Sequence, residues 1–319
     1  MMPTVFLTRV LPDLIMEKIR RHFRLRFNRA DRPLSKKEIL AGIKMADGLI
    51  SMLSDPIDRE VIDAAPRLRI IANYAVGYNN IDLKAAAERG IAVTNTPGVL
   101  TETTADLTWA LIFAVARRLP EAERLARSGK WTGWAPTQLL GSDVFGKTLG
   151  IVGIGRIGQA VARRAAGFSM RLLYHSRKSL PRRDEAALNV SFVPFSRLLK
   201  ESDFISLHLP LTNESHHLID RRALASMKPT AFLINTARGP IVDEKALIRA
   251  LRTGHLAGAG LDVFEDEPSL SPALRKLNNV VLLPHVGSAS LETRIRMGER
   301  VLENLLAGLS GKRPPNVIE

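Results

Sequence analysis

The sequence of 319 residues contains no cysteine, and aromatic residues make up only 5% of it. Without cysteine the chain cannot form disulfides, use a thiolate nucleophile, or hold zinc or an iron–sulfur cluster through thiolates. The chain also starts without a long hydrophobic run. Residues 4–8 form a brief apolar stretch that is too short for a signal-peptide core or a membrane span. We therefore expect a cytoplasmic protein with no membrane partner and no metal site.

Lysine and arginine outnumber aspartate and glutamate by 46 to 32, which gives a formal net charge of +14. Such a charge is typical of proteins that bind nucleic acids or membranes, but it also suits anionic substrates and cofactors. The basic residues are dense between Lys18 and Arg32, where only Phe23 and Phe27 supply aromatic side chains. With so few aromatic residues between the charges, a solvated face is favoured, and nucleic acid is not the expected partner.

Hydrophobic residues make up 45% of the chain, enough for a sizeable core, and the length suits two domains. Short runs rich in Val, Ile and Leu alternate with helical patterns, which predicts an α/β fold with two doubly wound parallel sheets. The first part predicts a small, flavodoxin-like unit with strands near residues 5–8, 25–27, 48–52, 70–75 and 92–94. The second part predicts a six-stranded Rossmann dinucleotide-binding domain with strands near residues 149–152, 172–174, 204–209, 231–235, 258–262 and 280–283.

The expected domain boundaries follow from the helices that flank these strands. A helical pattern runs from Thr101 to Leu119, ends before Pro120, and is long enough to bridge two domains. A last helix, over residues 291–309, is expected to return to the first domain. We therefore expect a discontinuous substrate-binding domain of residues 1–98 plus 289–319, and a dinucleotide-binding domain of residues 99–288.

Residues 128–145 form an irregular segment that holds two of the three tryptophans, Trp131 and Trp134. Because buried indoles usually serve packing, a loop anchored by these side chains is favoured. An arm that contacts a partner is the alternative.

Residues 148–162 predict a strand, a glycine turn and a helix, in the order that a dinucleotide pyrophosphate requires. Gly153 permits the tight turn, Gly155 lets the backbone approach the phosphates, and Gly158 allows close packing of the helix. At the start of this helix, Arg156 and Ile157 present backbone N–H groups to an anion. A tight turn without a ligand is the alternative, but the flanking strand and helix favour a cofactor site.

The end of the second strand commonly holds an aspartate or glutamate that binds the ribose 2′-hydroxyl of NAD. Here the residue is His175, followed by Ser176, Arg177 and Lys178. Two cations and a hydroxyl suit a 2′-phosphate, which a carboxylate would repel. The sequence therefore predicts a preference for NADPH, with NADH as the second cofactor. A solvated basic turn is the alternative interpretation.

Reduction of a carbonyl next to a carboxylate needs a fixed cation to polarise it and a donor to protonate the oxygen. Open α/β sheets bind ligands at the carboxyl ends of their strands. Arg238 follows the strand over residues 231–235, and His285 follows the strand over 280–283, so both are candidates. Glu267, after another strand end, is a candidate partner that would stabilise the protonated imidazole and fix its ring. Each residue taken alone has a structural alternative.

Together these segments resemble the D-isomer-specific 2-hydroxyacid dehydrogenase family, and the resemblance extends over nearly the whole chain. The segments that carry it are the glycine turn at Gly153, Asn235-Thr236-Ala237-Arg238-Gly239, Gly260-Leu261-Asp262-Val263-Phe264 with Glu267-Pro268, and Pro284-His285-Val286-Gly287-Ser288.

The resemblance implies roles for these residues. Arg238 would hold the substrate, and His285 would be the acid/base with Glu267 as its partner. Three further residues would lie beside the cofactor, namely Thr236, Ala237 and Asp262. The resemblance also implies a homodimer that forms through the nucleotide domain.

Within the family, Ala75-Val76-Gly77-Tyr78-Asn79-Asn80-Ile81-Asp82 resembles the glyoxylate and hydroxypyruvate reductase branch. This likeness implies that the backbone N–H groups of Val76 and Gly77 bind the substrate carboxylate and that Leu53 lines the facing wall. It also implies that Trp134 reaches the site of the partner subunit. The implied activity is NADPH-dependent reduction of a small 2-oxo acid, either glyoxylate to glycolate or hydroxypyruvate to D-glycerate.

Other activities use the same fold. A formate dehydrogenase is disfavoured, because hydride loss from formate needs no proton acceptor such as His285 with Glu267. A D-3-phosphoglycerate dehydrogenase is the enzymatic alternative, since the basic surplus could bind a second phosphate. A nucleotide-sensing, corepressor-like binding module is the non-enzymatic alternative, and it would have no chemical need for Arg238, Glu267 and His285.

Overall fold

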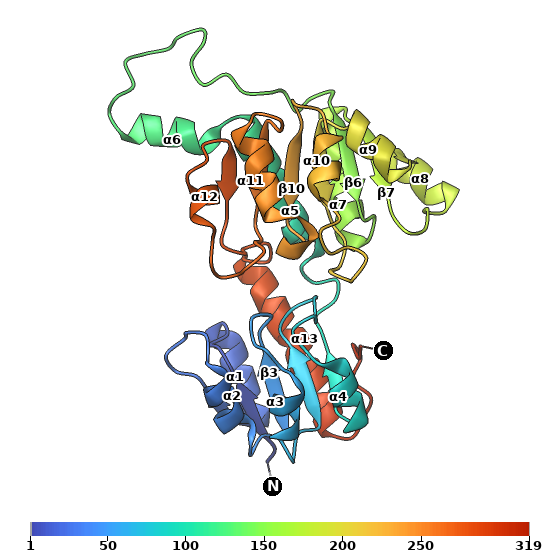
Figure 1. The fold of residues 1–319 in the computed structure, drawn as a ribbon. Helices are drawn as coiled ribbons and strands as arrows, with labels where there is room; N and C mark the ends of the chain where they lie inside the picture. Colours follow the sequence, from blue (N-terminus) through green and yellow to red (C-terminus); the bar gives the residue numbers. More distant parts are fainter. Residues whose placement is uncertain (1, 319) are drawn as a thin grey trace. The chain divides into compact units, whose positions relative to one another are not determined.

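The computed structural model describes residues 2–318, which divide into two compact units (Figure 1). One unit holds the chain up to Leu100 and again from Ser288, and the other holds Thr101–Gly287. Each unit has its own sheet of parallel strands with helices on both faces. The predicted fold class, two doubly wound α/β units, is confirmed.

The sheet of the first unit has the strand order β2-β1-β3-β4-β5. Its strands are β1 (Thr4–Leu7), β2 (Arg24–Phe27), β3 (Gly48–Ser51), β4 (Ile70–Asn73) and β5 (Ala92–Thr94). The central strands β3 and β4 are buried along their whole length, as expected for parallel strands covered on both faces. The predicted five strands are all present.

Helices on the two faces of this sheet bury separate apolar clusters. On one face, α1 (Asp13–His22) and α13 (Leu291–Leu309) pack against the strands through side chains such as Ile15 and Leu305. The other face is covered by α2 (Lys36–Ile43), α3 (Arg59–Asp63) and α4 (Leu83–Glu88). The last helix of the chain has the predicted bounds and completes the core of the first unit.

The second unit has seven parallel strands in the order β12-β11-β10-β9-β6-β7-β8. They are β6 (Thr148–Val152), β7 (Arg171–His175), β8 (Val190–Phe192), β9 (Phe204–Leu207), β10 (Phe232–Asn235), β11 (Gly258–Leu261) and β12 (Val280–Leu282). The prediction of six strands missed β8, the edge strand. Only Val190 of its three residues is buried, so the strand has no apolar run to reveal it.

The helices of the second unit also cover both faces of the sheet. On one face α5 (Thr101–Ala116) and α7 (Arg156–Ala165) pack against each other and the strands. The other face is covered mainly by α9 (Phe195–Glu201), α10 (Arg221–Ala225) and α11 (Glu244–Arg252). The remaining helices are α6 (Leu119–Arg127), α8 (Arg182–Leu188), α12 (Pro272–Arg275) and the 3-10 turns η1 (Ala166–Phe168) and η2 (Gly239–Ile241).

The helix predicted from Thr101 to Leu119 is wrong at its end. α5 stops at Ala116, Arg118 has a left-handed backbone with φ of 53°, and a new helix, α6, begins at Leu119. Pro120 lies in the first turn of α6, where its missing N–H costs no hydrogen bond. The whole of α5 belongs to the second unit.

The irregular segment over residues 128–145 projects from the second unit beyond α6 (Figure 1). Trp131 is 57% exposed and Trp134 82% exposed, and Leu140 and Phe145 are exposed as well. The expectation of a loop anchored by buried indoles is therefore wrong. An extended segment with few neighbours offers its apolar side chains nothing to pack on within one chain, which leaves the arm as the remaining interpretation.

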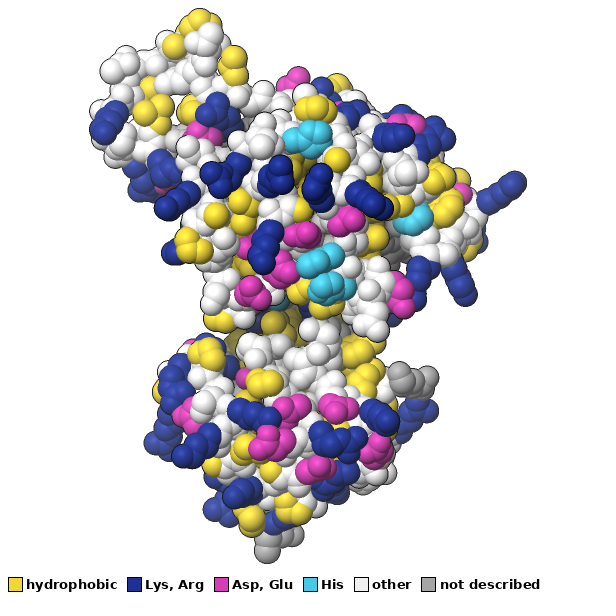
Figure 2. All heavy atoms as spheres, in the orientation of Figure 1, with side chains coloured by type: hydrophobic (Ala, Val, Ile, Leu, Met, Phe, Trp, Pro, Cys, Tyr) yellow, Lys and Arg dark blue, Asp and Glu magenta, His cyan; other side chains and the backbone are white. Residues whose placement is uncertain are grey.

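The basic excess is dispersed. On the face drawn in Figure 2, Lys and Arg side chains lie over both units, with Asp and Glu side chains among them. Two cations of the early basic run pair with acids, Lys18 with Glu299 and Arg32 with Glu38. Such pairing is typical of a solvated charged face, which stays the favoured interpretation. Among the described residues, no helix is long and apolar enough to cross a membrane.

Candidate active site

The glycine turn after β6 has the geometry that a pyrophosphate requires. Gly153 has a φ of 93°, and a Cβ there would lie 2.5 Å from the carbonyl oxygen of His208. A Cβ on Gly158 would lie 2.2 Å from the carbonyl oxygen of Gly153. A Cβ on Gly155 would meet no protein atom within 4 Å. The chain itself thus requires two of the glycines, whereas Gly155 leaves open space beside the start of α7.

The first turn of α7 adds donors to this space. Gly155 is the N-cap residue of the helix, and no side chain caps it. The N–H groups of a first helical turn have no partner within the helix, so they are available to an anion. The residues present therefore fit the pyrophosphate of a dinucleotide.

A cavity of about 890 Å³ opens beside the glycine turn. It is lined by the ends of β6 and β7, including four residues at which the sequence predicts a cofactor site: His175, Ser176, Arg177 and Lys178. The far wall, which was not predicted, comes from the loop after β9: His208, Leu209, Pro210, Thr212, Glu214, Ser215 and Leu218. Open α/β sheets bind ligands at the carboxyl ends of their strands, and β9 is the neighbour of β6 in the sheet. The same rule therefore indicates the loop after β9.

The loop over residues 176–180 is held by Tyr174, which is completely buried. The hydroxyl of Tyr174 accepts a hydrogen bond from the backbone N–H of Leu180 at 2.7 Å and donates to a carboxylate oxygen of Glu185. Burial and the neighbouring Glu185 raise the pKa of Tyr174 to about 12. The phenol therefore remains a neutral support for this loop at physiological pH.

Charges of both signs line this cavity, among them Arg177 and Glu214. Hydrogen bonds from the side chain of Thr212 and from its own backbone N–H lower the pKa of Glu214, and the charge of Arg177 acts in the same direction. The imidazole of His175 is engaged with the carbonyl oxygen of Val193, 3.0 Å from Nδ1. No carboxylate stands at the position of His175.

Three strand ends of the second unit bring the candidate reaction residues together. Nδ1 of His285, which follows β12, lies 2.7 Å from Oε2 of Glu267, which follows β11. The other carboxylate oxygen of Glu267 accepts the backbone N–H of Phe264 at 3.0 Å, so the carboxylate is fixed at both oxygens. Arg238, which follows β10, lies close enough for its charge to act on Glu267.

The electrostatics of this cluster favour charged groups. Burial raises the pKa of Glu267, but the hydrogen bond and charge of His285, the N–H of Phe264 and the charge of Arg238 outweigh it, so that the pKa lies below its ordinary value. Burial lowers the pKa of the Arg238 guanidinium, and the charge of Glu267 opposes this shift. An arginine remains protonated in either case. The cluster thus holds a carboxylate and an imidazole in direct hydrogen-bond contact, with a guanidinium whose charge acts on the carboxylate.

The loop that carries Arg238 is shaped by its neighbours. The side chain of Asn235 accepts from the N–H of Ala237 at 3.0 Å and donates to the carbonyl of Arg238 at 2.9 Å. A Cβ on Gly239 would lie 1.8 Å from the carbonyl oxygen of Phe264. Only glycine lets the two loops pass this closely, which places Arg238 beside the segment that ends at Glu267.

Asp262 supports His285 from below. Its two carboxylate oxygens accept the backbone N–H groups of Val286 at 2.7 Å and Gly287 at 2.8 Å, while its carbonyl accepts the N–H of His285 at 3.0 Å. His285 has a φ of 55°, a left-handed conformation that needs such support. Asp262 therefore stabilises the turn that carries His285, a contact that the sequence did not indicate.

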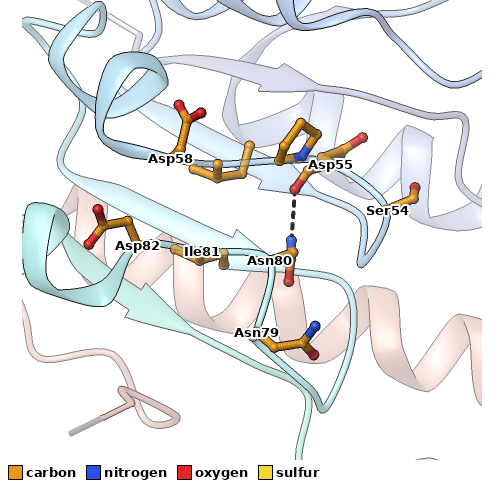
Figure 3. A pocket seen from close by; sticks show the side chains of 9 residues that line it. Ser54, Asp55, Asp58, Asn79, Asn80, Ile81 and Asp82 are labelled. Atoms are coloured by element: carbon orange, nitrogen blue, oxygen red, sulfur yellow. Dashed lines mark hydrogen bonds between the residues drawn. The ribbon is translucent and has the colours of Figure 1, made fainter. Parts of the chain in front are cut away.

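The first unit gathers the other predicted residues in two adjacent loops. Asn80 joins them, because its side-chain amide donates at 3.0 Å to the carbonyl of Met52 and, also at 3.0 Å, to that of Asp55. Figure 3 shows the hydrogen bond to Asp55. Backbone hydrogen bonds between Ile57 and Asn80 and between Asp82 and Ile57, both 2.9 Å, extend this connection. The loop with Leu53 and the loop with Val76 and Gly77 are therefore tied into one piece.

A smaller cavity of about 440 Å³ is lined by residues 54–58 and 79–82 of these two loops (Figure 3). Its carboxylates are already engaged. Asp58 caps α3 and pairs with Lys36, and Asp82 caps α4. Asp55 accepts from Thr8 and from the N–H of Met52. Among residues 2–318, no group of three or more His, Asp or Glu side chains could hold a metal ion.

A parallel sheet with a dinucleotide turn, together with a His–Glu pair and a half-buried arginine at the strand ends, defines the class of nicotinamide-dependent dehydrogenases. Residues 109–287 match the family model described as D-isomer specific 2-hydroxyacid dehydrogenase, NAD binding domain. The chain belongs to this family.

Relatives match the chain over its full length. A glyoxylate reductase of Korarchaeum cryptofilum is 57% identical, and one of Thermococcus gammatolerans is 52% identical; each match covers 100% of this chain and 96% of the relative. Among solved structures, the NADPH-dependent glyoxylate/hydroxypyruvate reductase of Sinorhizobium meliloti, in complex with NADP and malonate, is 34% identical. Its TM-score is 0.88, and the match covers 100% of this chain and 97% of that one.

Proposed function

We propose that this protein reduces a small 2-oxo acid, glyoxylate to glycolate or hydroxypyruvate to D-glycerate, with NADPH as the preferred cofactor. The observation that carries the proposal is the 2.7 Å hydrogen bond between His285 and Glu267 beside the half-buried Arg238. Carbonyl reduction needs a proton donor and a fixed cation, and this cluster supplies both. The names of the relatives support the choice of substrate, and family membership supports the reaction type.

The roles of the residues follow from this chemistry. Bound NADPH supplies the hydride that the keto carbon of the substrate accepts. Arg238 polarises the carbonyl and stabilises the negative charge that develops on its oxygen. Protonated His285 transfers its proton to that oxygen, Glu267 stabilises the imidazolium and keeps its ring oriented, and solvent then returns a proton to His285.

The two units would divide the binding work. The second unit, within residues 99–288, would hold the cofactor at Gly153, Gly155, Gly158 and the start of α7, with Thr236, Ala237 and Asp262 beside the nicotinamide. The first unit, residues 1–98 with 289–319, would bind the substrate carboxylate through the N–H groups of Val76 and Gly77, with Leu53 as an apolar wall.

The preference for NADPH is supported by the cavity beside the glycine turn. Ser176, Arg177 and Lys178 line it, and a histidine replaces the acidic residue that would bind a ribose hydroxyl. Guanidinium and ammonium groups form strong, charge-assisted hydrogen bonds with phosphate oxygens. NADH would lack these contacts and serve as the weaker cofactor.

We also propose a homodimer that forms through the arm over residues 128–145. Support comes from its exposed apolar side chains, among them Trp134 at 82% exposure. Large exposed apolar groups on an extended segment are typical of a surface that a partner covers. In the dimer Trp134 would reach the partner subunit's substrate site.

The test is the initial rate of NADPH and NADH oxidation, followed at the nicotinamide absorbance. Glyoxylate, hydroxypyruvate, pyruvate and 3-phosphohydroxypyruvate are offered in turn. We expect rapid turnover of NADPH with glyoxylate or hydroxypyruvate. Turnover with 3-phosphohydroxypyruvate alone would assign a phosphoglycerate dehydrogenase instead, and no turnover with any of the four would contradict the proposal.

A further inference from the structure

We propose that Asn73 and Asn95 are positioning residues that aim the carboxylate-binding N–H groups of the Val76–Gly77 loop. This inference rests on the proposed function, in which that loop binds the substrate carboxylate. Neither asparagine belongs to the segments in which the sequence indicated function.

Asn73 is the last residue of β4 and is completely buried. Its side-chain amide donates to the carbonyl oxygen of Gly77 at 2.7 Å. Its side-chain oxygen accepts from the hydroxyl of Ser51 at 3.0 Å, and Ser51 ends the neighbouring strand β3. Two adjacent strand ends thus hold one carbonyl of the loop.

Asn95 follows β5 directly, on the other side of β4. Its side-chain amide donates to the carbonyl oxygen of Val76 at 2.8 Å. The next residue, Thr96, donates its backbone N–H to the carbonyl of Ala75 at 2.9 Å. Three successive carbonyls, those of Ala75, Val76 and Gly77, are therefore anchored to the ends of neighbouring strands.

The anchored carbonyls decide where the N–H groups point. In a planar trans peptide the C=O of one residue and the N–H of the next point in opposite directions. The three anchors consequently turn the N–H groups of Val76, Gly77 and Tyr78 away from the asparagines. Within the described part of the chain, none of these three N–H groups donates to a protein acceptor. A carboxylate can therefore accept hydrogen bonds from these three N–H groups.

The choice of asparagine also fits an anionic substrate. An amide donates a hydrogen bond without carrying a net charge, whereas an aspartate at either position would repel the substrate carboxylate. Asn95 is itself held from behind, because its carbonyl accepts from the side chain of Asn304 on α13. The loop is thus supported by neutral groups throughout, and its N–H groups are fixed before the substrate arrives.

The test replaces each asparagine with leucine, which has a similar size but neither donates nor carries charge. Asn95→Leu is the main variant, because Asn95 is only partly buried and the fold should tolerate the change. Asn73→Leu is the second variant. Asn28→Leu is the matched control, since the amide of Asn28 also donates to backbone carbonyls in the first unit, those of Thr8 and Arg32, but at the far edge of the sheet.

The readouts are KM for glyoxylate and Kd for oxalate on the NADPH-loaded enzyme, with kcat, Kd for NADPH and the thermal midpoint measured alongside. We expect Asn95→Leu to raise KM and Kd for oxalate about tenfold, as for the loss of oriented hydrogen bonds to a charged group. The kcat and the Kd for NADPH should stay within about twofold, and Asn28→Leu should match the wild type. A folded Asn95→Leu variant with wild-type KM and oxalate binding would overturn the inference. A wild-type enzyme that neither turns over glyoxylate nor binds oxalate would instead contradict the proposed function.

Discussion

The candidate functional loops of the two units use side chains and backbone groups in opposite ways. In the proposed mechanism the reacting groups of the second unit are ionisable side chains, Arg238, Glu267 and His285, and the backbone positions them, as Phe264 N–H does for Glu267. The binding groups that we propose in the first unit are backbone N–H groups, and side chains such as Asn73 and Asn95 would position them. The difference follows from the tasks, because moving a proton needs a titratable group, while holding a carboxylate needs only fixed donors.

The comparison leads to separate expectations for chemistry and for binding. Changes in the second unit should alter the rate of the chemical step or the affinity for the cofactor. Changes behind the loop of the first unit should alter the affinity for the 2-oxo acid. Each prediction below tests one side of this division, beginning with the largest expected effect.

Removing the proton donor should have the largest effect. We expect His285→Ala to lower kcat by roughly 100-fold or more, as is typical when a general acid is lost. The Kd for NADPH, measured by fluorescence titration, should remain within about twofold, because the imidazole lies outside the cavity at the glycine turn. Wild-type turnover in this variant would remove His285 from the mechanism and with it the chemical role of the second unit.

The cofactor preference should depend on Arg177. Arg177→Asp removes charge-assisted hydrogen bonds to the 2′-phosphate and adds a repulsive charge, so Kd for NADPH should rise about 100-fold while Kd for NADH changes little. Arg183→Asp is the matched control, because Arg183 carries the same charge on α8 but does not line the cavity. Equal losses for both cofactors in Arg177→Asp would mean that Arg177 does not read the phosphate.

Glu267→Gln should have a smaller effect on catalysis. The amide can still orient the imidazole but no longer stabilises its positive charge, so we expect kcat to fall about tenfold at neutral pH. A kcat that stays at the wild-type value at neutral pH would show that Glu267 only orients the ring.

The same carboxylate predicts a pH dependence of stability. Its pKa in the folded protein lies below the ordinary value of 4.5, so the ionised form stabilises the fold above about pH 4.5, and this contribution is lost as the pH falls through the folded-state pKa. Urea unfolding of the wild type and Glu267→Gln should therefore differ most at neutral pH and converge in acid. A difference that grows on acidification would contradict the assigned direction.

The sequence predicts the candidate reaction residues of the second unit but not the positioning residues of the first unit, for a physical reason. Side-chain chemistry at strand ends is visible in the chain, so the glycine turn, Arg238, Glu267 and His285 could be identified together with the α/β fold. A residue that works through a neighbouring strand cannot be identified this way. Asn73 and Asn95 lie 22 residues apart, and only the pairing of β4 with β5 brings them to one loop.

The remaining errors have local causes. β8 is a three-residue edge strand of which only Val190 is buried. α5 ends early because Arg118 adopts a left-handed backbone just before α6 begins at Leu119. The indoles of the arm are exposed, although the expectation for buried aromatic side chains favoured a packed loop. Packing rules that hold within one chain do not apply to a segment without neighbours in that chain.

The most direct test of the division between chemistry and binding is a single-turnover measurement on the NADPH-loaded enzyme over a range of glyoxylate concentrations. The wild type, His285→Ala and Asn95→Leu are compared for the limiting rate and the half-saturating concentration. The account predicts that His285→Ala lowers the limiting rate by roughly 100-fold with little change in half-saturation, while Asn95→Leu raises half-saturation about tenfold and keeps the limiting rate. Equal losses of limiting rate in both variants, with unchanged half-saturation, would contradict it.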